Sequence, residues 1–258
     1  MNIKTMAQWA QEGKSPEVLF WVGCAGSFDD RYKKVTLAVC RILDRVGMSY
    51  GVLGSEESCS GDPARRAGNE FLFQMQALMN IQTLQAYEVK KIVTACPHCF
   101  NTLKNEYPAL GGNFEVLHHS ELLQQLIENG KIVAKDGQPF RGKRIVFHDS
   151  CYLGRANEVY EAPRAVLEAL DAELTEMKRS RKNGLCCGAG GAQMFKEAET
   201  GKKEINLERI EEALETRPEV VAVGCPFCMT MLADGIKNKE KEAEVKVLDL
   251  AELIDASF

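Results

Sequence analysis

The cysteines of this chain recur with the same spacing in its two halves. Cys24 and Cys59 are separated by the same interval as Cys151 and Cys186, and one Cys-Pro-x-Cys sequence follows in each half. The second of these sequences starts slightly later in its half than the first does, which indicates a short insertion before it. This agreement over four landmarks predicts two copies of one structural unit.

Buried strands are predicted where short apolar runs precede the cysteines. These runs cover 19–22, 91–95, 145–147 and 220–224. A further strand and helix are predicted after each Cys-Pro-x-Cys, at 114–117 with 121–127 and at 244–248 with 251–254. Segments such as 33–46 and 162–170 carry apolar residues at three- and four-residue intervals, which is typical of amphipathic helices.

Strands that alternate with helices imply parallel sheets, in which ligands gather at the carboxyl ends of the strands. We therefore predict an α/β fold of two pseudo-symmetric Rossmann-like halves, each a small parallel sheet with helices. The cysteine loops are expected at the C-terminal strand ends. The polar, turn-rich stretch 129–142 is the predicted linker. We place the first cysteine-rich half at 17–130, the second at 140–258, and an N-terminal extension at 1–16.

The composition argues against several classes of protein. Of 258 residues, 45% are hydrophobic and 27% charged, and the net charge of −5 argues against a general nucleic-acid binder. No apolar run approaches the roughly 18–20 residues of a membrane span, and the first residues lack the apolar core of a secretory signal. We therefore expect a cytoplasmic protein that is peripheral to the inner membrane only through a partner. In a reducing compartment, ten cysteines indicate metal or redox chemistry rather than disulfides.

Nine of the ten cysteines are candidate metal ligands. The second half offers five, which are Cys151, Cys186, Cys187, Cys225 and Cys228. The first half offers four, with Ser60 at the position of Cys187, and these are Cys24, Cys59, Cys96 and Cys99. Four thiolates suit either tetrahedral zinc or an iron–sulfur cluster. Because a structural zinc site closes at four ligands, the fifth thiol favours a cluster in the second half. Zinc remains the alternative to a cluster in the first half.

Two cysteine patterns have other interpretations. Cys40 corresponds to Leu167 in the repeat and lies on the apolar side of a predicted helix, so it is expected to be a buried core thiol. The Cys-Pro-His-Cys sequence at 96–99 resembles a thiol–disulfide oxidoreductase motif. That interpretation explains neither Cys24 and Cys59 nor the matching sequence in the second half.

Other polar residues lie near the cysteines. The glycines of 188–191 match neither a phosphate loop nor a dinucleotide fingerprint, and we expect them to let backbone N–H groups approach sulfur. The basic runs 65–66 and 178–182 are interpreted as charges that offset an anionic cluster, as a docking site for an acidic partner, or as solvated turns. Four histidines are candidates for hydrogen bonds to sulfur or for ordinary polar and core positions: His98, His118, His119 and His148.

The second half resembles the cysteine-rich "CCG" domain through the segments 147–155 and 186–191. This domain occurs in tandem in one of the subunits of heterodisulfide reductase, in its fused relatives and in iron–sulfur subunits of glycolate, lactate and glycerol-3-phosphate oxidising complexes. The resemblance covers the chain after about residue 17. In the first half, the segment 59–66 has Ser60 in place of the second cysteine. It is more similar to the fused, membrane-linked reductases associated with electron transfer from electron-transfer flavoprotein to quinone.

The resemblance implies a noncubane [4Fe-4S] cluster on the five cysteines of the second half. The chain lacks the Cys-x2-Cys-x2-Cys-x3-Cys-Pro run of ferredoxin-type cubanes and any flavin or nicotinamide fingerprint. We therefore expect an oxidoreductase subunit rather than a complete enzyme, with a ferredoxin-like or flavin-containing partner that is membrane-anchored in some complexes. Two other functions remain open: direct disulfide reduction at an exposed cluster, and a zinc-stabilised scaffold without redox activity.

Overall fold

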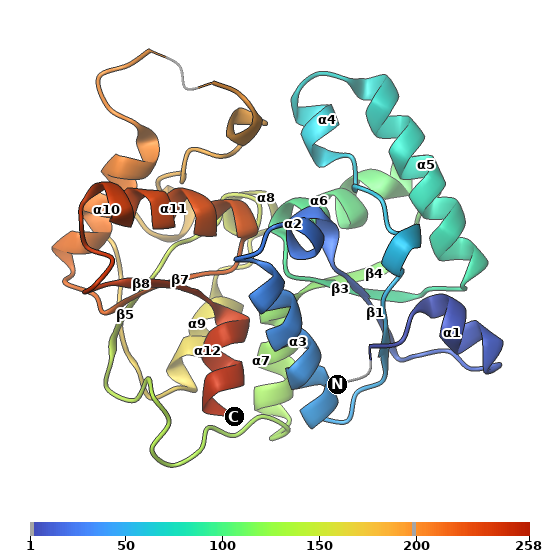
Figure 1. Ribbon diagram of the computed structural model, residues 1–258, viewed down its shortest axis with the longest axis horizontal. Helices are drawn as coiled ribbons and strands as arrows, with labels where there is room; N and C mark the ends of the chain where they lie inside the picture. Colours follow the sequence, from blue (N-terminus) through green and yellow to red (C-terminus); the bar gives the residue numbers. More distant parts are fainter. Residues whose placement is uncertain (1–2, 198–199) are drawn as a thin grey trace. The chain divides into compact units, whose positions relative to one another are not determined.

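The computed structural model describes residues 3–197 and 200–258 (Figure 1). The chain divides into two compact units, Met1–Leu122 and Leu123–Phe258. Within the described residues, each unit contains a four-stranded sheet in which all strand pairs are parallel. The α/β class predicted from the sequence is therefore confirmed.

The sheet of the first unit has the strand order β2-β1-β3-β4. Its strands are β1 (Val18–Trp21), β2 (Tyr50–Gly51), β3 (Lys91–Thr94) and β4 (Glu115–His118). Its helices are α1 (Met6–Gln11), α2 (Gly23–Phe28), α3 (Lys33–Arg45), α4 (Asp62–Arg66), α5 (Glu70–Ala86) and α6 (Pro97–Asn101). Short helical turns cover Gly54–Glu56, Thr102–Glu106 and Tyr107–Leu110. The helix α7 (His119–Glu128) contains the boundary between the two units.

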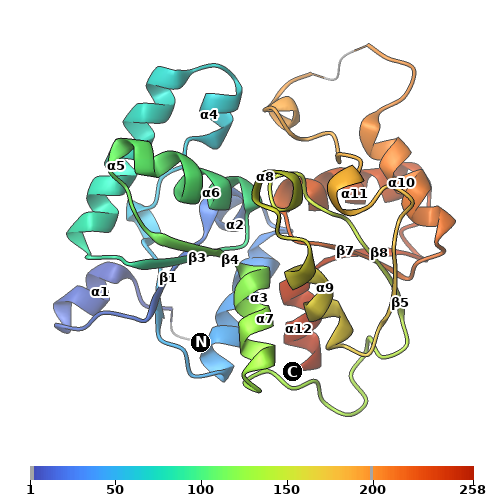
Figure 2. The same ribbon diagram turned by 180° about the vertical axis from the view of Figure 1, so that it is seen from behind.

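The sheet of the second unit has the order β6-β5-β7-β8, which is the same order in the repeat. Its strands are β5 (Arg144–Phe147), β6 (Glu173–Thr175), β7 (Val220–Val223) and β8 (Lys246–Asp249). Its helices are α8 (Gly154–Asn157), α9 (Glu161–Glu168), α10 (Ile205–Glu215), α11 (Pro226–Asn238) and α12 (Leu250–Ser257). Short turns cover Arg181–Asn183 and Gln193–Phe195. Figure 2 shows α9 and α12 on one face of this sheet and α10 and α11 on the other.

The strand register repeats as well as the strand order. Leu19 on β1 lies opposite Ile92 on β3, and Val146 on β5 lies opposite Val221 on β7. Leu19 and Val146 precede the first cysteine of their unit by the same interval, and Ile92 and Val221 precede the Cys-Pro-x-Cys sequence by the same interval. Two central strands therefore occupy corresponding positions in both units, and the cysteines that follow them do so too.

Hydrophobic burial explains why the central strands and the amphipathic helices form. All four residues of β1 and of β7 are buried, as expected for parallel strands covered on both faces. On α3, the apolar side faces the core and includes Val35, Val39 and Cys40. Cys40 is fully buried, which agrees with its expected role as a core thiol. Helix α5 and the short strands β2 and β6 lie outside the predicted elements, because none of them shows a clear amphipathic period.

The described part of the N-terminal extension belongs to the first unit and packs against the end of its strand β2. Thr5 caps α1, and the Met6 amide donates to the Val52 carbonyl at 2.8 Å. The Trp9 indole N–H donates to the Tyr50 carbonyl at 2.9 Å. Residues 1–2 of the predicted extension lie outside the described residues. No helix in the described ranges 3–197 and 200–258 is long and apolar enough to cross a membrane.

Candidate metal centre

The nine candidate cysteines lie beyond the carboxyl ends of the strands, as predicted. In the second unit, Cys151 follows β5, while Cys186 and Cys187 lie in the segment after β6. Cys225 is the N-cap residue of α11, and Cys228 lies in the first turn of that helix. The amino end of a helix favours negative charge, so this placement suits thiolates. None of the ten cysteines, all of which lie in the described part of the chain, is in a disulfide bond.

The five thiols of the second unit form one continuous group. Hydrogen-bond contacts link the side chains of Cys151 and Cys186, of Cys186 and Cys187, of Cys187 and Cys228, and of Cys228 and Cys225. Hydrogen bonds from Cys151 and Cys187 lower the pKa of the Cys186 thiol. The contact with Cys186 raises the pKa of Cys151, and burial adds to this effect. The adjacent cysteines 186 and 187 therefore both lie in this continuous group of thiols.

The first unit brings together a smaller group. The thiols of Cys24 and Cys59 are hydrogen-bonded, and this contact, together with burial, raises the pKa of Cys24. Cys96 is buried at the N-cap position of α6 and is followed by Cys99 in the first turn. The contact with Cys24 lowers the pKa of Cys59 to about 7. An added Cβ at Gly23 would lie 3.4 Å from the Cys99 sulfur, so the backbone approaches this thiol closely.

Ser60 occupies the place that the repeat assigns to Cys187. The Ser60 hydroxyl donates to the Cys99 sulfur at 3.5 Å, just as Cys187 contacts Cys228 in the second unit. Ser60 is buried, with 2% of its surface exposed. The first unit therefore presents four thiols and one hydroxyl where the second presents five thiols.

A glycine at the same repeat position in each unit directs its backbone N–H at a thiol. Gly61 and Gly188 follow Cys59 and Cys186 at the same interval and have φ angles of +93° and +95°, a region that favours glycine. The Gly61 amide donates to the Cys59 sulfur at 3.5 Å, and the Gly188 amide donates to the Cys186 sulfur at 3.3 Å. The amide of Gly190 also donates to Cys186. The predicted approach of glycine N–H groups to sulfur is confirmed for Gly188 and Gly190, and the contact of Gly61 was not among the predictions.

A buried ion pair holds the cysteine segments of the second unit. The Asp149 carboxylate accepts hydrogen bonds from the Arg164 guanidinium at 2.9 and 3.1 Å and from the Arg181 amide at 2.7 Å. Arg164 also donates to Glu176 at 2.6 and 2.9 Å. Asp149 lies just before Cys151 in the sequence, and Arg181 lies shortly before Cys186. This pair therefore ties two cysteine-bearing segments together, a role that the sequence analysis did not predict.

An uncharged network holds the corresponding loop of the first unit. The Asn80 amide donates to the Cys59 carbonyl at 2.9 Å and to the Tyr107 hydroxyl at 3.0 Å. The Tyr107 hydroxyl donates to the Ser60 carbonyl at 3.0 Å. Asn80 lies on α5, a helix that the apolar pattern did not predict. The sequence contains no local signal for these contacts, because they join residues 21 to 47 positions apart.

A half-buried carboxylate supports the turn before Cys24. Glu57 accepts hydrogen bonds from the amides of Val22 at 3.1 Å and Gly23 at 2.5 Å. Burial raises the pKa of Glu57 to about 7. Glu57 was not among the predicted residues, and it fixes the backbone on which the Cys24 thiol is carried.

The predicted histidines have different surroundings. His98 Nδ1 contacts the Asp62 carboxylate at 2.9 Å, and His118 Nδ1 contacts the Ser120 hydroxyl at 2.7 Å. His119 Nδ1 lies 3.2 Å from His118 Nε2. In contrast, His148 has a ring nitrogen that lies with the sulfurs of Cys187 and Cys228 in a group whose members are within 4.8 Å of one another. Of the four predicted histidines, His148 is therefore the one that the described contacts place beside cysteine sulfurs.

The basic runs form ion pairs within their own units. Arg66 binds Asp62 and Glu106, and Arg65 binds Glu70 and Glu106. In the second unit, Arg179 pairs with the glutamates at positions 208 and 212, and Arg181 pairs with the glutamate at 161. These contacts favour local structural roles for the charges over a docking surface.

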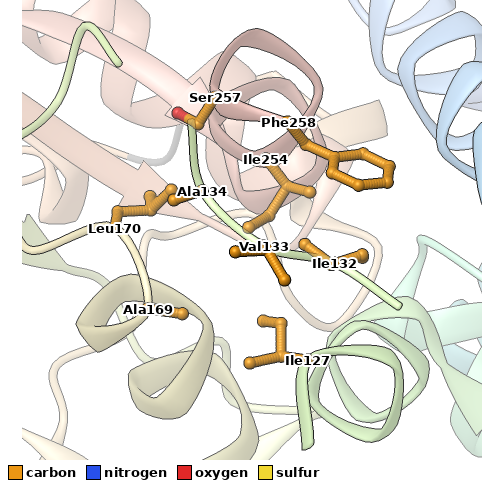
Figure 3. Close-up of a pocket in the computed structure, with 9 residues that line it drawn as sticks. All are labelled: Ile127, Ile132, Val133, Ala134, Ala169, Leu170, Ile254, Ser257 and Phe258. Carbon is orange, nitrogen blue, oxygen red and sulfur yellow. The ribbon is translucent and has the colours of Figure 1, made fainter. Parts of the chain in front are cut away.

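A cavity of about 190 Å³ lies elsewhere in the second unit (Figure 3). It is lined by segments that lead into β5 and β6 and by the end of α12. The lining residues are Ile127, Ile132, Val133, Ala134, Ala169, Leu170, Ile254, Ser257 and Phe258. None of these residues is a cysteine or carries a titratable side chain, so the cavity is separate from the thiol groups.

The residues of the second unit fit an iron–sulfur cluster. Five thiols supply sulfur ligands, and backbone N–H groups point at the sulfur of Cys186. In addition, His148 Nε2 is buried and has no hydrogen-bond partner among the described residues. Buried polar atoms normally have a partner, so this atom is expected to face a group bound by the thiols. Four thiols suffice for a tetrahedral metal ion, so the fifth indicates a polynuclear centre.

The fold and the paired thiol groups define a tandem cysteine-rich α/β protein. The sequence matches the cysteine-rich domain family, CCG, over residues 18–104 and 145–233, and the chain belongs to this family. It is 49% identical over 99% of its length to the "Probable iron-sulfur-binding oxidoreductase FadF" of Bacillus subtilis, and covers 36% of that protein. It is 46% identical over 95% of its length to the "EtfAB:quinone oxidoreductase" of Syntrophomonas wolfei, and covers 35% of it.

A third relative comes from Methanosarcina barkeri. It is a subunit of the dihydromethanophenazine:CoB–CoM heterodisulfide reductase. The chain is 32% identical to it over 92% of the chain's length, and covers 58% of that protein. The chain therefore spans about one third of the length of the first two relatives and more than half of the third.

Proposed function

We propose that this chain is the iron–sulfur electron-transfer part of a heterodisulfide-reductase-like oxidoreductase complex. In that role it relays electrons between a flavin-containing donor and a quinone-linked partner. The donor is either of the electron-transfer-flavoprotein type or a 2-hydroxyacid dehydrogenase. The observation that carries the proposal is the continuous group of five thiols with adjacent Cys186 and Cys187 both in contact with their neighbours. An iron–sulfur cluster held there would supply one-electron oxidation and reduction without making or breaking bonds in a substrate.

The proposed ligands differ between the units. In the second unit, a noncubane [4Fe-4S] cluster is assigned to Cys151, Cys186, Cys187, Cys225 and Cys228. In the first unit, an iron–sulfur cluster, with zinc as the alternative, is assigned to Cys24, Cys59, Cys96 and Cys99. The hydroxyl of Ser60 lies where a fifth thiol would lie, and a hydroxyl is much harder to deprotonate than a thiol. The Ser60 oxygen is therefore not assigned as a ligand.

The proposed partners follow from the redox groups that this chain's sequence lacks. A cluster without a cubane relay or a flavin needs another domain or subunit to receive and return its electrons. The printed names of the relatives include an "EtfAB:quinone oxidoreductase" and a "Probable membrane-anchored ferredoxin" of Chromohalobacter salexigens. They support a ferredoxin-like or flavin-containing partner and a membrane contact made through that partner. We propose a cytoplasmic location for the chain itself. We keep 17–130 and 140–258 as the proposed domain bounds.

Direct disulfide reduction is the second candidate. Cys151 and Cys186 are only partly buried, whereas Cys187, Cys225 and Cys228 are buried. The thiol group is thus partly exposed at Cys151 and Cys186, which is where a small disulfide would have to approach it. The similarity to a heterodisulfide reductase subunit is consistent with this activity.

Anaerobic purification from the native host tests the proposal. The protein is expected to be brown, with iron and acid-labile sulfide in equal amounts, and to be recovered with a ferredoxin-like or flavin-containing chain. A colourless protein that contains zinc and no iron would refute the cluster. Reduction of a small disulfide by the purified protein with an artificial donor, in the absence of any partner, would favour the second candidate over the relay.

A further inference from the structure

His148 is buried between an arginine and the thiol group of the second unit. It follows β5 and exposes 1% of its surface. Its Nδ1 accepts a hydrogen bond from Arg209 Nε at 3.0 Å. Its Nε2 has no hydrogen-bond partner among residues 3–197 and 200–258. A ring nitrogen of His148 lies within 4.8 Å of the sulfurs of Cys187 and Cys228.

The contact with Arg209 decides where the ring proton lies. An arginine side chain has only donors, so His148 Nδ1 must offer a lone pair to the Arg209 Nε–H. The single proton of the neutral ring is then on Nε2. Arg209 is held in this orientation by donation from Nη1 to the Arg179 carbonyl at 2.8 Å and to Glu212 at 3.3 Å. The tautomer is thus imposed by a residue on α10, 61 positions away in the sequence.

This tautomer distinguishes two roles for His148. A histidine that binds a metal through Nε2 has a lone pair there and donates its other N–H to an acceptor, commonly a carboxylate or a carbonyl. His148 shows the opposite arrangement, because its other nitrogen accepts. Nε2 therefore carries a proton and acts as a donor, although the position of the ring beside the sulfurs of Cys187 and Cys228 would by itself also suit a metal ligand.

The first unit has a similar donor at the same repeat position. Trp21 precedes Cys24 by the same interval as His148 precedes Cys151, and it is fully buried. Its indole Nε1–H also has no hydrogen-bond partner among the described residues. A buried ring N–H thus occurs at this position in both repeats, which favours a shared role over an accident of packing.

We infer that His148 directs its Nε2–H at a sulfur of the group that the five thiols of the second unit would hold, and that Arg209 positions it by fixing this tautomer. The inference rests on the five-thiol site proposed above, and it assigns His148 as a positioning residue and not as a metal ligand. A hydrogen bond to a cluster sulfur stabilises the more negative, reduced state and so raises the reduction potential. His148 therefore favours acceptance of an electron by this site.

The tautomer is measured first, on wild-type protein. Long-range proton–nitrogen NMR of protein labelled with ¹⁵N-histidine reports which ring nitrogen carries the proton, and the spectrum of His148→Gln assigns the signal. We expect a proton on Nε2 and an unprotonated Nδ1. A proton on Nδ1 would overturn the inference. This measurement needs no particular metal, so it remains decisive if metal analysis finds zinc and refutes the proposed cluster.

The second measurement compares His148→Phe and His148→Gln with wild type. In His148→Phe, iron and sulfide per chain should be unchanged, and the potential should fall. We expect about a tenfold lower ratio of reduced to oxidised protein at a fixed ambient potential, equivalent to about 59 mV for one electron. His148→Gln retains an N–H donor and should restore part of the shift, which a purely steric role would not predict. Loss of iron from folded His148→Phe would show a ligand, and an unchanged potential would exclude the hydrogen bond.

Discussion

The substitution Cys187→Ser tests whether the fifth thiol distinguishes the two units. Cys187 is 3% exposed and contacts both Cys186 and Cys228. The first unit shows what a serine does at this position, because the Ser60 hydroxyl is buried and donates to Cys99 at 3.5 Å. The variant should therefore fold, with a new hydroxyl hydrogen bond that points at Cys228.

The expected effect on metal content is much larger than the effect on folding. Exchange of one weak hydrogen bond for another costs about 0.5–1.5 kcal/mol or less. By contrast, a thiol with an ordinary pKa of about 8.5 becomes a thiolate ligand readily, whereas a serine hydroxyl does not. Cys187→Ser should thus lose or alter one cluster and keep the other. The loss of iron should be about half of the total if each unit holds four irons.

The assay combines metal analysis with low-temperature EPR of anaerobically purified protein. Cys40→Ser is the matched control, since it makes the same chemical change at a buried thiol outside both groups. Ser60→Cys is the reciprocal variant, and it should make the spectrum of the first site more similar to that of the second. Indistinguishable iron content and spectra for wild type and Cys187→Ser would show that Cys187 is not a ligand, and the proposed difference between the units would be wrong.

Four further outcomes are expected. Cys40→Ala should lower the free energy of unfolding by about 1–3 kcal/mol, because it leaves a small cavity, and the iron content should stay unchanged. Anaerobic denaturation and metal analysis measure the two, and a folded variant that has lost iron would contradict this prediction. In metal-free protein at about pH 8, iodoacetamide should modify Cys59 well before Cys40, because contact with Cys24 lowers the pKa of Cys59 to about 7 and burial raises that of Cys40 to about 11; peptide mass mapping measures the order. Gly188→Ala should cost about 1–2 kcal/mol, because the residue has a φ of +95°, and an unchanged denaturation midpoint would argue against strain there. Asp149→Ala should lower the free energy of unfolding by about 3–5 kcal/mol, because it removes a partner of buried Arg164. A loss below about 1 kcal/mol in a denaturant titration would show that Glu176 alone satisfies the guanidinium.

Much of the fold was predictable because the repeat and the strand pattern are local properties of the sequence. The apolar runs at 19–22 and 220–224 correspond to β1 (Val18–Trp21) and β7 (Val220–Val223). A parallel sheet aligns the carboxyl ends of its strands, so the cysteines that follow the strands gather at one edge. Helix α5 was not predictable in this way, since it exposes Phe71 and Met79 while it buries Phe73 and thus lacks a single apolar face.

The sequence by itself determined which thiols are available, but the tertiary structure decided how they are linked. Spacing placed Ser60 opposite Cys187 in the repeat, whereas only the fold showed its hydroxyl directed at the Cys99 sulfur. Likewise, four histidines were equivalent candidates until Arg209 was found to donate to His148 Nδ1. The physical reason is that a ring tautomer, like a hydrogen bond to sulfur, depends on the direction of a donor from a distant helix. Sequence periodicity determines which face of a helix is buried, but it does not specify which polar atom that face will meet.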